Sequence, residues 1–179
     1  DLVAAGRADV AVVGGTQGAI TPVLMAAYAN LRVLSPSGWV RPFDRRRDGF
    51  VFAEGAACLV LESLEHATAR GARVYAEVLG SGHTNDAASL VSPSGSGAVE
   101  CITDALDDAG IDPADVVAVN ALGTGTLVND RREAEGLHEV FGATPPPVSS
   151  IKRVLGHAAG ASGAFEAVAA TLTVHTGVA

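Results

Sequence analysis

The amino-acid sequence predicts an α/β protein, and three features carry this prediction. Short apolar runs of the kind found in buried strands alternate with segments of helical periodicity. Hydrophobic residues make up 48% of the 179 residues, which is enough for one sizeable core, and the length alone favours a single domain. Aromatic residues make up only 4%. Small side chains therefore fill much of this core and let helices and strands pack closely.

The apolar runs predict four strands buried on both faces. Such a strand is a run of about four to eight apolar or β-branched residues bounded by turn-forming residues. The first run ends at Gly14 and Gly15, and the strand at residues 58–61 follows an interruption at Glu54 and Gly55. The predicted strands, which we expect to belong to mixed sheets, cover residues 10–13, 58–61, 74–79 and 116–121.

Helical segments lie between and after these strands, and capping residues mark their ends. Thr21, Ser63 and Asn129 are each expected to be the N-cap of a helix, because their side-chain oxygens can accept the first free N–H groups. Gly110 is expected to stop a helix at its C-terminus. The predicted helices cover residues 21–31, 63–70, 97–109, 129–141 and 158–175. Residues 1–9 have no N-cap signal and indicate the last turns of a helix that closes at Gly6, so the chain is expected to begin within an element.

Charge and cysteine usage exclude several classes of protein. A net charge of −8 and a pI near 5.0 argue against nucleic-acid binding, which needs a basic face. The only cationic cluster, Arg45-Arg46-Arg47, is either a solvated loop or a contact for an acidic partner. Cys58 and Cys101 lack metal-ligand spacing and are expected to be buried. No apolar run approaches the roughly 20 residues that span a bilayer, so we expect a cytoplasmic protein with no membrane contact.

Three segments contain residues with a recognisable chemical pattern. They are residues 41–56 (RPFDRRRDGFVFAEGA), residues 120–126 (NALGTGT) with Asp130 and Glu133 soon after, and residues 149–163 (SSIKRVLGHAAGASG). Together they resemble the β-ketoacyl synthase family, and with the strands between them they cover nearly the whole chain. Ala53 stands where the family usually has glycine.

The resemblance implies a layered αβαβα fold of the thiolase type. Residues 1–179 would form a partial ketosynthase domain, comprising the end of its N-terminal half and most of its C-terminal half. In this family a cysteine thiol accepts an acyl chain, and decarboxylation of a malonyl unit yields the carbanion equivalent that attacks the thioester. The implied partner is acyl carrier protein, whose phosphopantetheine arm brings the substrate, so no cofactor or metal of the protein's own is expected. The family also implies a dimer, either a homodimer or a heterodimer with another ketosynthase-like chain.

Five residues match functional positions of the family. His157 matches the histidine that donates to the malonyl thioester oxygen, and Lys152 and Glu133 match residues paired near that histidine. Thr124 and Thr126 match the threonines that bind the pantetheine arm. Each residue also has a plainer interpretation: a histidine at a helix start, two surface charges, and threonines that satisfy their own turn.

The departures from the family pattern concern three parts of its active site. Leu122 stands where the family has histidine, and loss of one such donor costs a factor of roughly a hundred to a thousand in rate. The cysteine nucleophile and the final glycine-rich loop have no counterpart in the sequence, and Cys58 and Cys101 do not match the nucleophile. We therefore expect no condensing activity from this chain alone.

Three functions follow from these matches and departures. The first is a ketosynthase-like subunit of a polyketide or fatty-acid pathway, with acyl transfer and decarboxylative condensation. The second is a catalytically silent partner like a chain-length factor, which Leu122 favours but Lys152 and His157 disfavour. The third is a divergent acyltransferase that dispenses with malonyl decarboxylation. The residue at the nucleophile position would separate the second from the others.

Overall fold

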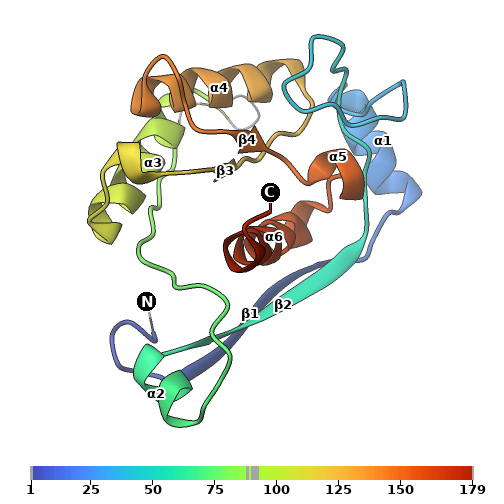
Figure 1. The fold of residues 1–179 in the computed structure, drawn as a ribbon. Coiled ribbons are helices and arrows are strands. Elements are labelled where there is room, and N and C mark those ends of the chain that lie inside the picture. Colours follow the sequence, from blue (N-terminus) through green and yellow to red (C-terminus); the bar gives the residue numbers. More distant parts are fainter. Residues whose placement is uncertain (1, 88, 90–92, 179) are drawn as a thin grey trace. The chain divides into compact units, whose positions relative to one another are not determined.

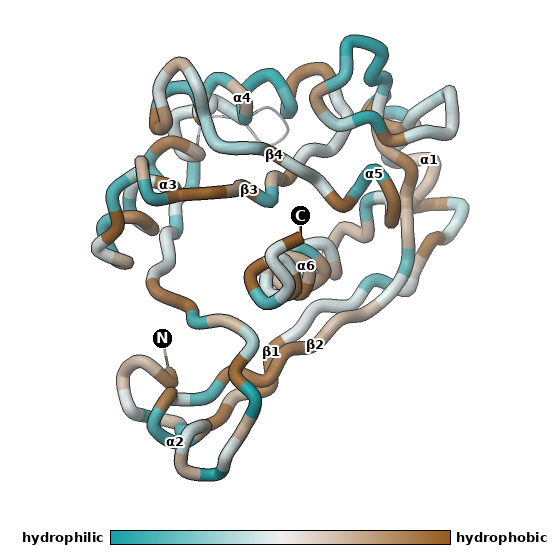
Figure 2. The backbone as a smooth tube through the Cα atoms, in the orientation of Figure 1, coloured by the Kyte–Doolittle hydropathy of each residue, from teal (hydrophilic) through white to brown (hydrophobic). Residues whose placement is uncertain are grey.

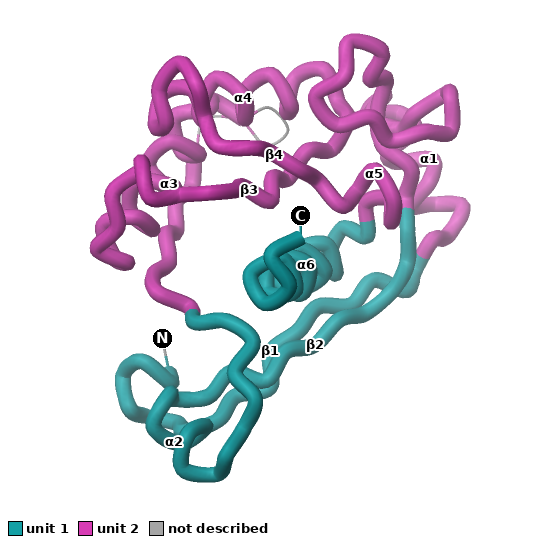
Figure 3. The backbone as a smooth tube through the Cα atoms, viewed as in Figure 1, with its two compact units in different colours: residues 1–19, 53–77, 158–179 teal, residues 20–52, 78–157 magenta. Residues whose placement is uncertain are grey.

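The chain folds as two compact units, each built from segments that are distant in the sequence. The structure, a computed structural model, describes residues 2–87, 89 and 93–178 (Figure 1). Unit 1 comprises the chain up to residue 19, residues 53–77 and the chain from residue 158 (Figure 3). Unit 2 comprises residues 20–52 and 78–157.

Unit 1 is a two-stranded antiparallel ladder with helices packed against it. Strand β1 (Val10–Gln17) pairs with β2 (Gly55–Glu62), so that Val12 lies opposite Val60. Helix α6 (Ser162–Thr176) and the 3₁₀ turn before it (Ala159–Ala161) contact both strands. A short helix, α2 (Leu64–Ala69), follows β2, with Ser63 as the predicted N-cap. Two of the four predicted strands are therefore confirmed as strands.

The prediction that the two strands of unit 1 are buried on both faces is wrong. Because side chains alternate along a strand, residues 11, 15, 57, 59 and 61 are partly covered, whereas Val12 is 75% exposed and Val60 is 60% exposed. Cys58 points the same way and is exposed, so its predicted burial is wrong. Hydrophobic residues colour the ladder brown near α2 in Figure 2. An apolar run alone did not distinguish a strand covered on one face from a strand covered on two.

Unit 2 contains most of the helices and a short parallel ladder. Helix α3 packs against α4, and the 3₁₀ turn at Pro113–Asp115 also contacts α4. The elements are α1 (Pro22–Asn30), α3 (Ser96–Ala109), β3 (Val119–Asn120), α4 (Leu127–Phe141), β4 (Val148–Ser149) and α5 (Lys152–Leu155).

The other two predicted strands differ from the structure. Strand β3 pairs with β4 in parallel, and the N–H of Ala121 continues the ladder to the carbonyl of Ser149 at 2.8 Å. Residues 116–118 have no such partner, and Val117 is 84% exposed, so the strand predicted at 116–121 is too long. Residues 74–79 form no strand, because no segment among the described residues pairs with them. A strand needs a neighbour to accept and donate its hydrogen bonds, and a sequence run does not supply one.

The predicted helix ends agree with the structure at most positions. The hydroxyl of Thr21 accepts from Leu24 N at 3.3 Å, and Gly110 ends α3 in the left-handed conformation. Gly6 closes a turn with φ +65°, in which Arg7 N donates to Leu2 O at 2.9 Å, although residues 2–6 form a turn and not a helix. Helix α6 begins at Ser162, four residues after its predicted start.

Helix α4 begins two residues before its predicted start, with Thr126 and not Asn129 as the N-cap. The reason is Asp130, whose carboxylate accepts from Gly125 N just ahead of the helix at 3.0 and 3.1 Å and fixes its first turn. In the loop that precedes α3, the carboxylate of Asp86 accepts from Ser94 N at 2.7 Å and Gly97 N at 3.1 Å. Residues 88 and 90–92 of that loop lie outside the described residues. Within the described chain, no helix is long and apolar enough to cross a membrane.

A close approach between β1 and the 3₁₀ turn of unit 1 yields a first prediction. A Cβ atom on Gly15 would lie 2.5 Å from the carbonyl oxygen of Gly160, so Gly15→Ala should lower the free energy of unfolding by about 1–3 kcal/mol. A Cβ on Gly163, which lies in α6, would meet nothing within 4 Å. Gly163→Ala is the matched control and should raise stability by about 0.5–1 kcal/mol. Urea unfolding of both variants checks this, and equal stabilities would contradict the packing.

Candidate functional site

The centre of the site is the backbone of the loop that joins β3 to α4. The carboxylate of Glu133 accepts from Leu122 N at 2.7 Å and from Gly123 N at 2.8 Å. On the other side of the same residue, Lys152 Nζ donates to Leu122 O at 2.8 Å. Residue 122 is therefore held by a carboxylate on its N–H and an ammonium on its carbonyl.

Burial strengthens the hydrogen bonds that Glu133 and Lys152 make to residue 122. Lys152 is only 1% exposed, and it enters the loop from the start of α5. A buried ammonium needs hydrogen-bond acceptors, because removal from water without them costs several kcal/mol. Burial raises the pKa of Glu133, while the two backbone N–H groups and, more weakly, Lys152 oppose this rise. The two residues expected to pair thus meet through the backbone of Leu122.

His157 follows Gly156, whose φ of +77° favours glycine at the end of α5. Its backbone N donates to Val51 O at 2.8 Å, and Phe52 and His157 form a parallel β-bridge. The imidazole lies edge-to-face with Phe50, at a centroid distance of 4.7 Å, and nearly parallel to Phe52 at 6.5 Å. The segment at 50–52 therefore fixes the position of His157.

Burial, and then the charge of Lys152, lower the pKa of His157 to about 4. At neutral pH the ring is therefore uncharged, with one nitrogen as a donor and the other as an acceptor. Such a ring can donate a hydrogen bond to a carbonyl oxygen that gains negative charge. This chemistry is what the sequence match of His157 predicts.

A second buried charge holds the next part of the loop. Asp130 is 1% exposed, and it accepts from Phe43 N at 2.8 Å and from Gly125 N. Arg47 lies 3.9 Å from its carboxylate and donates to Thr126 O at 3.2 Å. The segments at 41–56 and 120–126 are thus joined, and we had not assigned Asp130 or Arg47 a place in the site. Their signal in the sequence was a run of charges whose burial could not be predicted.

The two threonines form a hydroxyl chain that ends at Asp130. Their Oγ1 atoms are 2.9 Å apart, and Thr124 Oγ1 donates to Asp130 Oδ1 at 3.3 Å. Thr124 is 7% exposed, whereas Thr126 is half-buried. With Thr124 donating to the carboxylate, Thr126 donates to Thr124 and keeps lone pairs that can accept a ligand N–H.

Leu122 lies within this arrangement and not in a remote core. Its backbone is the meeting point of Glu133 and Lys152, while its side chain, with the residue 42% exposed, has no group that donates a hydrogen bond. The part of the chain that the structure describes has no group of three His, Cys, Asp or Glu side chains placed to hold a metal ion.

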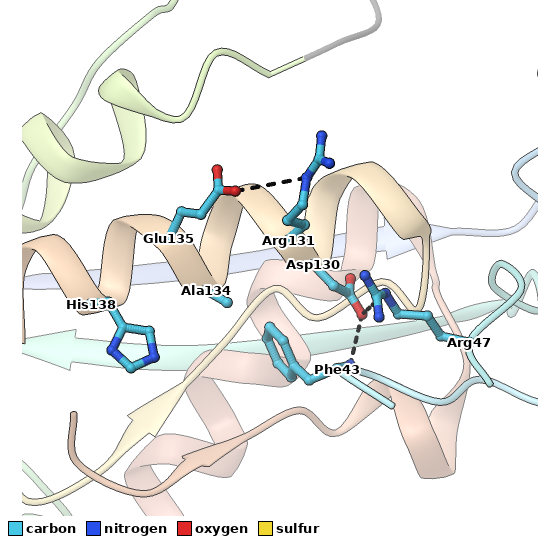
Figure 4. A pocket seen from close by; sticks show the side chains of 7 residues that line it. All are labelled: Phe43, Arg47, Asp130, Arg131, Ala134, Glu135 and His138. Carbon is cyan, nitrogen blue, oxygen red and sulfur yellow. Dashed lines mark hydrogen bonds and ion pairs between the residues drawn. The ribbon is translucent and has the colours of Figure 1, made fainter. Parts of the chain in front are cut away.

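A cavity of about 460 Å³ lies beside α4 in unit 2 (Figure 4). Phe43 and Ala134 contribute apolar surface, and Arg131 pairs with Glu135 at 3.8 Å along α4. His157 and Lys152 are not among the lining residues, which are Phe43, Arg47, Asp130, Arg131, Ala134, Glu135 and His138. The cavity therefore adjoins the part of the site that contains Asp130 and Arg47, and not the part that contains His157.

Comparison with known families identifies the class of protein. Residues 1–67 match "Beta-ketoacyl synthase, N-terminal domain", and residues 75–179 match "Beta-ketoacyl synthase, C-terminal domain". The second match alone covers more than half of the chain. This chain belongs to the β-ketoacyl synthase family.

Individual relatives support the assignment and its thiolase-like α/β fold. The chain is 43% identical to "3-oxoacyl-[acyl-carrier-protein] synthase 2" of Staphylococcus aureus, over 97% of the chain and 45% of the relative. It superposes on "The ishigamide ketosynthase/chain length factor" with a TM-score of 0.94 and 41% identity, over 99% of this chain and 43% of that one. A third structure, "AntDE:AntF (apo): type II PKS acyl-carrier protein in complex with its ketosynthase bound to the hexaketide", superposes with a TM-score of 0.92 and 36% identity, over 96% of this chain and 45% of that one. The chain spans less than half the length of these relatives.

The lowered pKa of His157 yields a second prediction. Because the folded pKa of about 4 lies below 6.5, the unfolded state binds more protons between these values. His157 therefore contributes stability that is complete above pH 6.5 and is lost as the pH falls through 4. Lys152→Met should raise the pKa of His157 but leave it below 6.5, because burial is the larger cause.

NMR titration of the His157 imidazole checks this prediction. The matched control is Arg153→Met, which removes an exposed cation from the adjacent position. A wild-type pKa near 6.5, or an equal shift in both variants, would contradict the described surroundings of His157.

Proposed function

We propose that the whole protein acts as a ketosynthase-like subunit of a polyketide or fatty-acid pathway. It would transfer acyl groups and condense thioesters carried by acyl carrier protein, with release of carbon dioxide from the malonyl unit. The observation that carries this proposal is the neutral, half-buried His157 beside the buried Lys152. Relatives whose names or titles refer to acyl-carrier-protein synthases and to a ketosynthase in complex with its carrier protein support it.

His157 would act when the malonyl carbon–carbon bond breaks. The carboxylate leaves as carbon dioxide, and its bonding electron pair moves onto the thioester to form an enolate. The ring N–H of His157 would donate to that enolate oxygen, whose developing charge makes the bond stronger in the transition state. The enolate carbon then attacks the acyl thioester on the enzyme, and the thiolate leaves.

The loop at 124–126 would bind the pantetheine arm of the carrier. Thr126 retains lone pairs for an amide N–H of that arm, and Asp130 holds the loop through Thr124 and Gly125. The partners that we propose are therefore acyl carrier protein and, in a dimer, either a second copy or another ketosynthase-like chain. The phosphopantetheine would arrive on the carrier, and no resident cofactor is proposed.

Leu122 supports a second candidate function. It occupies the position where the family places another donor histidine, and one similar structure is a ketosynthase with its chain-length factor. A silent partner of that kind, or an acyltransferase without malonyl decarboxylation, would tolerate leucine there. Retention of Lys152 and His157 favours an active subunit, because a silent partner has little need for a buried cation beside a neutral imidazole.

Incubation of the whole protein with acyl and malonyl carrier proteins separates these functions. Acylated enzyme, released carbon dioxide and a β-ketoacyl product, all dependent on His157, would support condensation. Acylation without carbon dioxide would indicate the divergent acyltransferase. The absence of both would leave the silent partner.

Leu122→His supplies the third prediction. The backbone of residue 122 is already fixed by Glu133 and Lys152, so histidine can enter without rebuilding the loop. Decarboxylation of the malonyl carrier should rise by a factor of roughly ten to a thousand, since one preorganised donor has about this effect. Leu122→Gln, which offers a different donor, is the control for polarity. No increase in the histidine variant would show that Leu122 does not limit the reaction.

A further inference from the structure

Three aromatic residues of unit 2 gather around His157. Phe50 lies 5.7 Å from Phe52, and Tyr28 of α1 packs edge-to-face against both, at 5.9 and 4.8 Å between ring centroids. Phe50 is 6% exposed and Phe52 is 9% exposed. The imidazole is thus one member of a four-ring cluster, within the range in which aromatic rings attract one another.

The backbone explains why two of these rings reach the histidine together. Phe50 and Phe52 are separated by one residue in an extended segment, so their side chains lie on the same face. Val51, between them, accepts the backbone N–H of His157 at 2.8 Å and is 37% exposed. The same peptide segment therefore fixes the histidine backbone and places both rings against its side chain.

The two rings contact the imidazole in different ways. Phe50 stands at 80° to it with the ring centroids 4.7 Å apart, whereas Phe52 lies at 19° with the centroids 6.5 Å apart, which is an offset-stacked arrangement. Of the two phenylalanines, Phe52 is therefore the one whose ring plane is nearly parallel to the imidazole, so that a rotated imidazole would turn its edge toward Phe52. Tyr28 supports Phe52 from α1 at the shortest ring distance among the three aromatic residues.

We propose that Phe52 is a positioning residue for His157: its buried ring holds the imidazole in one orientation and keeps water from the side on which it lies. Its consequence for catalysis rests on the proposed function. A ring that is already oriented and dry loses less free energy when it donates to a developing oxyanion. The positively charged group that also acts on His157 is Lys152, which disfavours the imidazolium form.

The test replaces the ring by an aliphatic side chain. Phe52→Leu should move the His157 Hε1 resonance as the ring current is lost, and should raise the His157 pKa by roughly one unit toward 6.5 as water enters. If Phe52→Leu does not fold, Phe52→Met is a second variant that removes the ring. Phe52→Tyr keeps the ring and should retain the wild-type resonance and pKa of His157. Phe141→Leu, at the end of α4, is the matched control and should leave His157 unchanged. Equal effects of Phe52→Leu and Phe141→Leu on His157 would overturn the proposal.

Activity of the whole protein separates the two proposals. If Phe52 positions His157, Phe52→Leu should lower kcat for malonyl decarboxylation severalfold with an unchanged KM for the malonyl carrier. Phe52→Tyr should keep the wild-type kcat. A whole protein that never decarboxylates would refute the proposed function, while the NMR result would still decide whether Phe52 positions the ring. Decarboxylation with an unaltered kcat in Phe52→Leu would refute the catalytic part of the inference alone.

Discussion

Two buried charges of opposite sign determine the conformation of the loop at 121–126. Lys152 and Asp130 are the largest fully buried side chains among the described residues, and each is satisfied in part by that loop's backbone. Removal of one such partner leaves an uncompensated charge and typically costs about 3–5 kcal/mol. The loop therefore has one low-energy path, and the residues on it are positioned by groups that lie outside it.

This constraint separates the frame of the site from its chemistry. The hydrogen bonds that Glu133 and Lys152 make to residue 122 involve its backbone N–H and carbonyl, so its side chain can change without loss of those hydrogen bonds. A family member can thus replace a donor histidine by leucine and retain the same fold. The high structural similarity to a ketosynthase and chain-length-factor pair is consistent with such a shared frame. The identity of residue 122 is then a question of reaction, not of folding.

Local signals in the sequence predicted local structure well. The caps at Thr21 and Ser63 and the stop at Gly110 depend on neighbouring residues only, and the structure has them. The failures at residues 74–79 and at Cys58 involve partners distant in the sequence, because pairing and cover decide whether an apolar run becomes a buried strand.

The candidate site shows the same division. The motif residues Glu133, Lys152 and His157 were found by resemblance. In the structure Glu133 accepts from the backbone N–H groups of residues 122 and 123, and Lys152 donates to the carbonyl of residue 122. The ring cluster around His157 was not predicted from the sequence. It joins Tyr28 to Phe50 and Phe52 across more than twenty residues, and no spacing rule connects a helix residue to an extended segment at that separation.

The surroundings of His157 decide between two chemical roles for a histidine. A general base works best when its pKa lies near the operating pH, and a ring with a pKa of about 4 holds a proton too weakly for that role. A hydrogen-bond donor has the opposite requirement, since it must keep its N–H and remain uncharged before the reaction. Burial and Lys152 both favour the neutral ring, and the segment at 50–52 fixes its place. The histidine is therefore suited to stabilise negative charge on an oxygen, and poorly suited to abstract a proton.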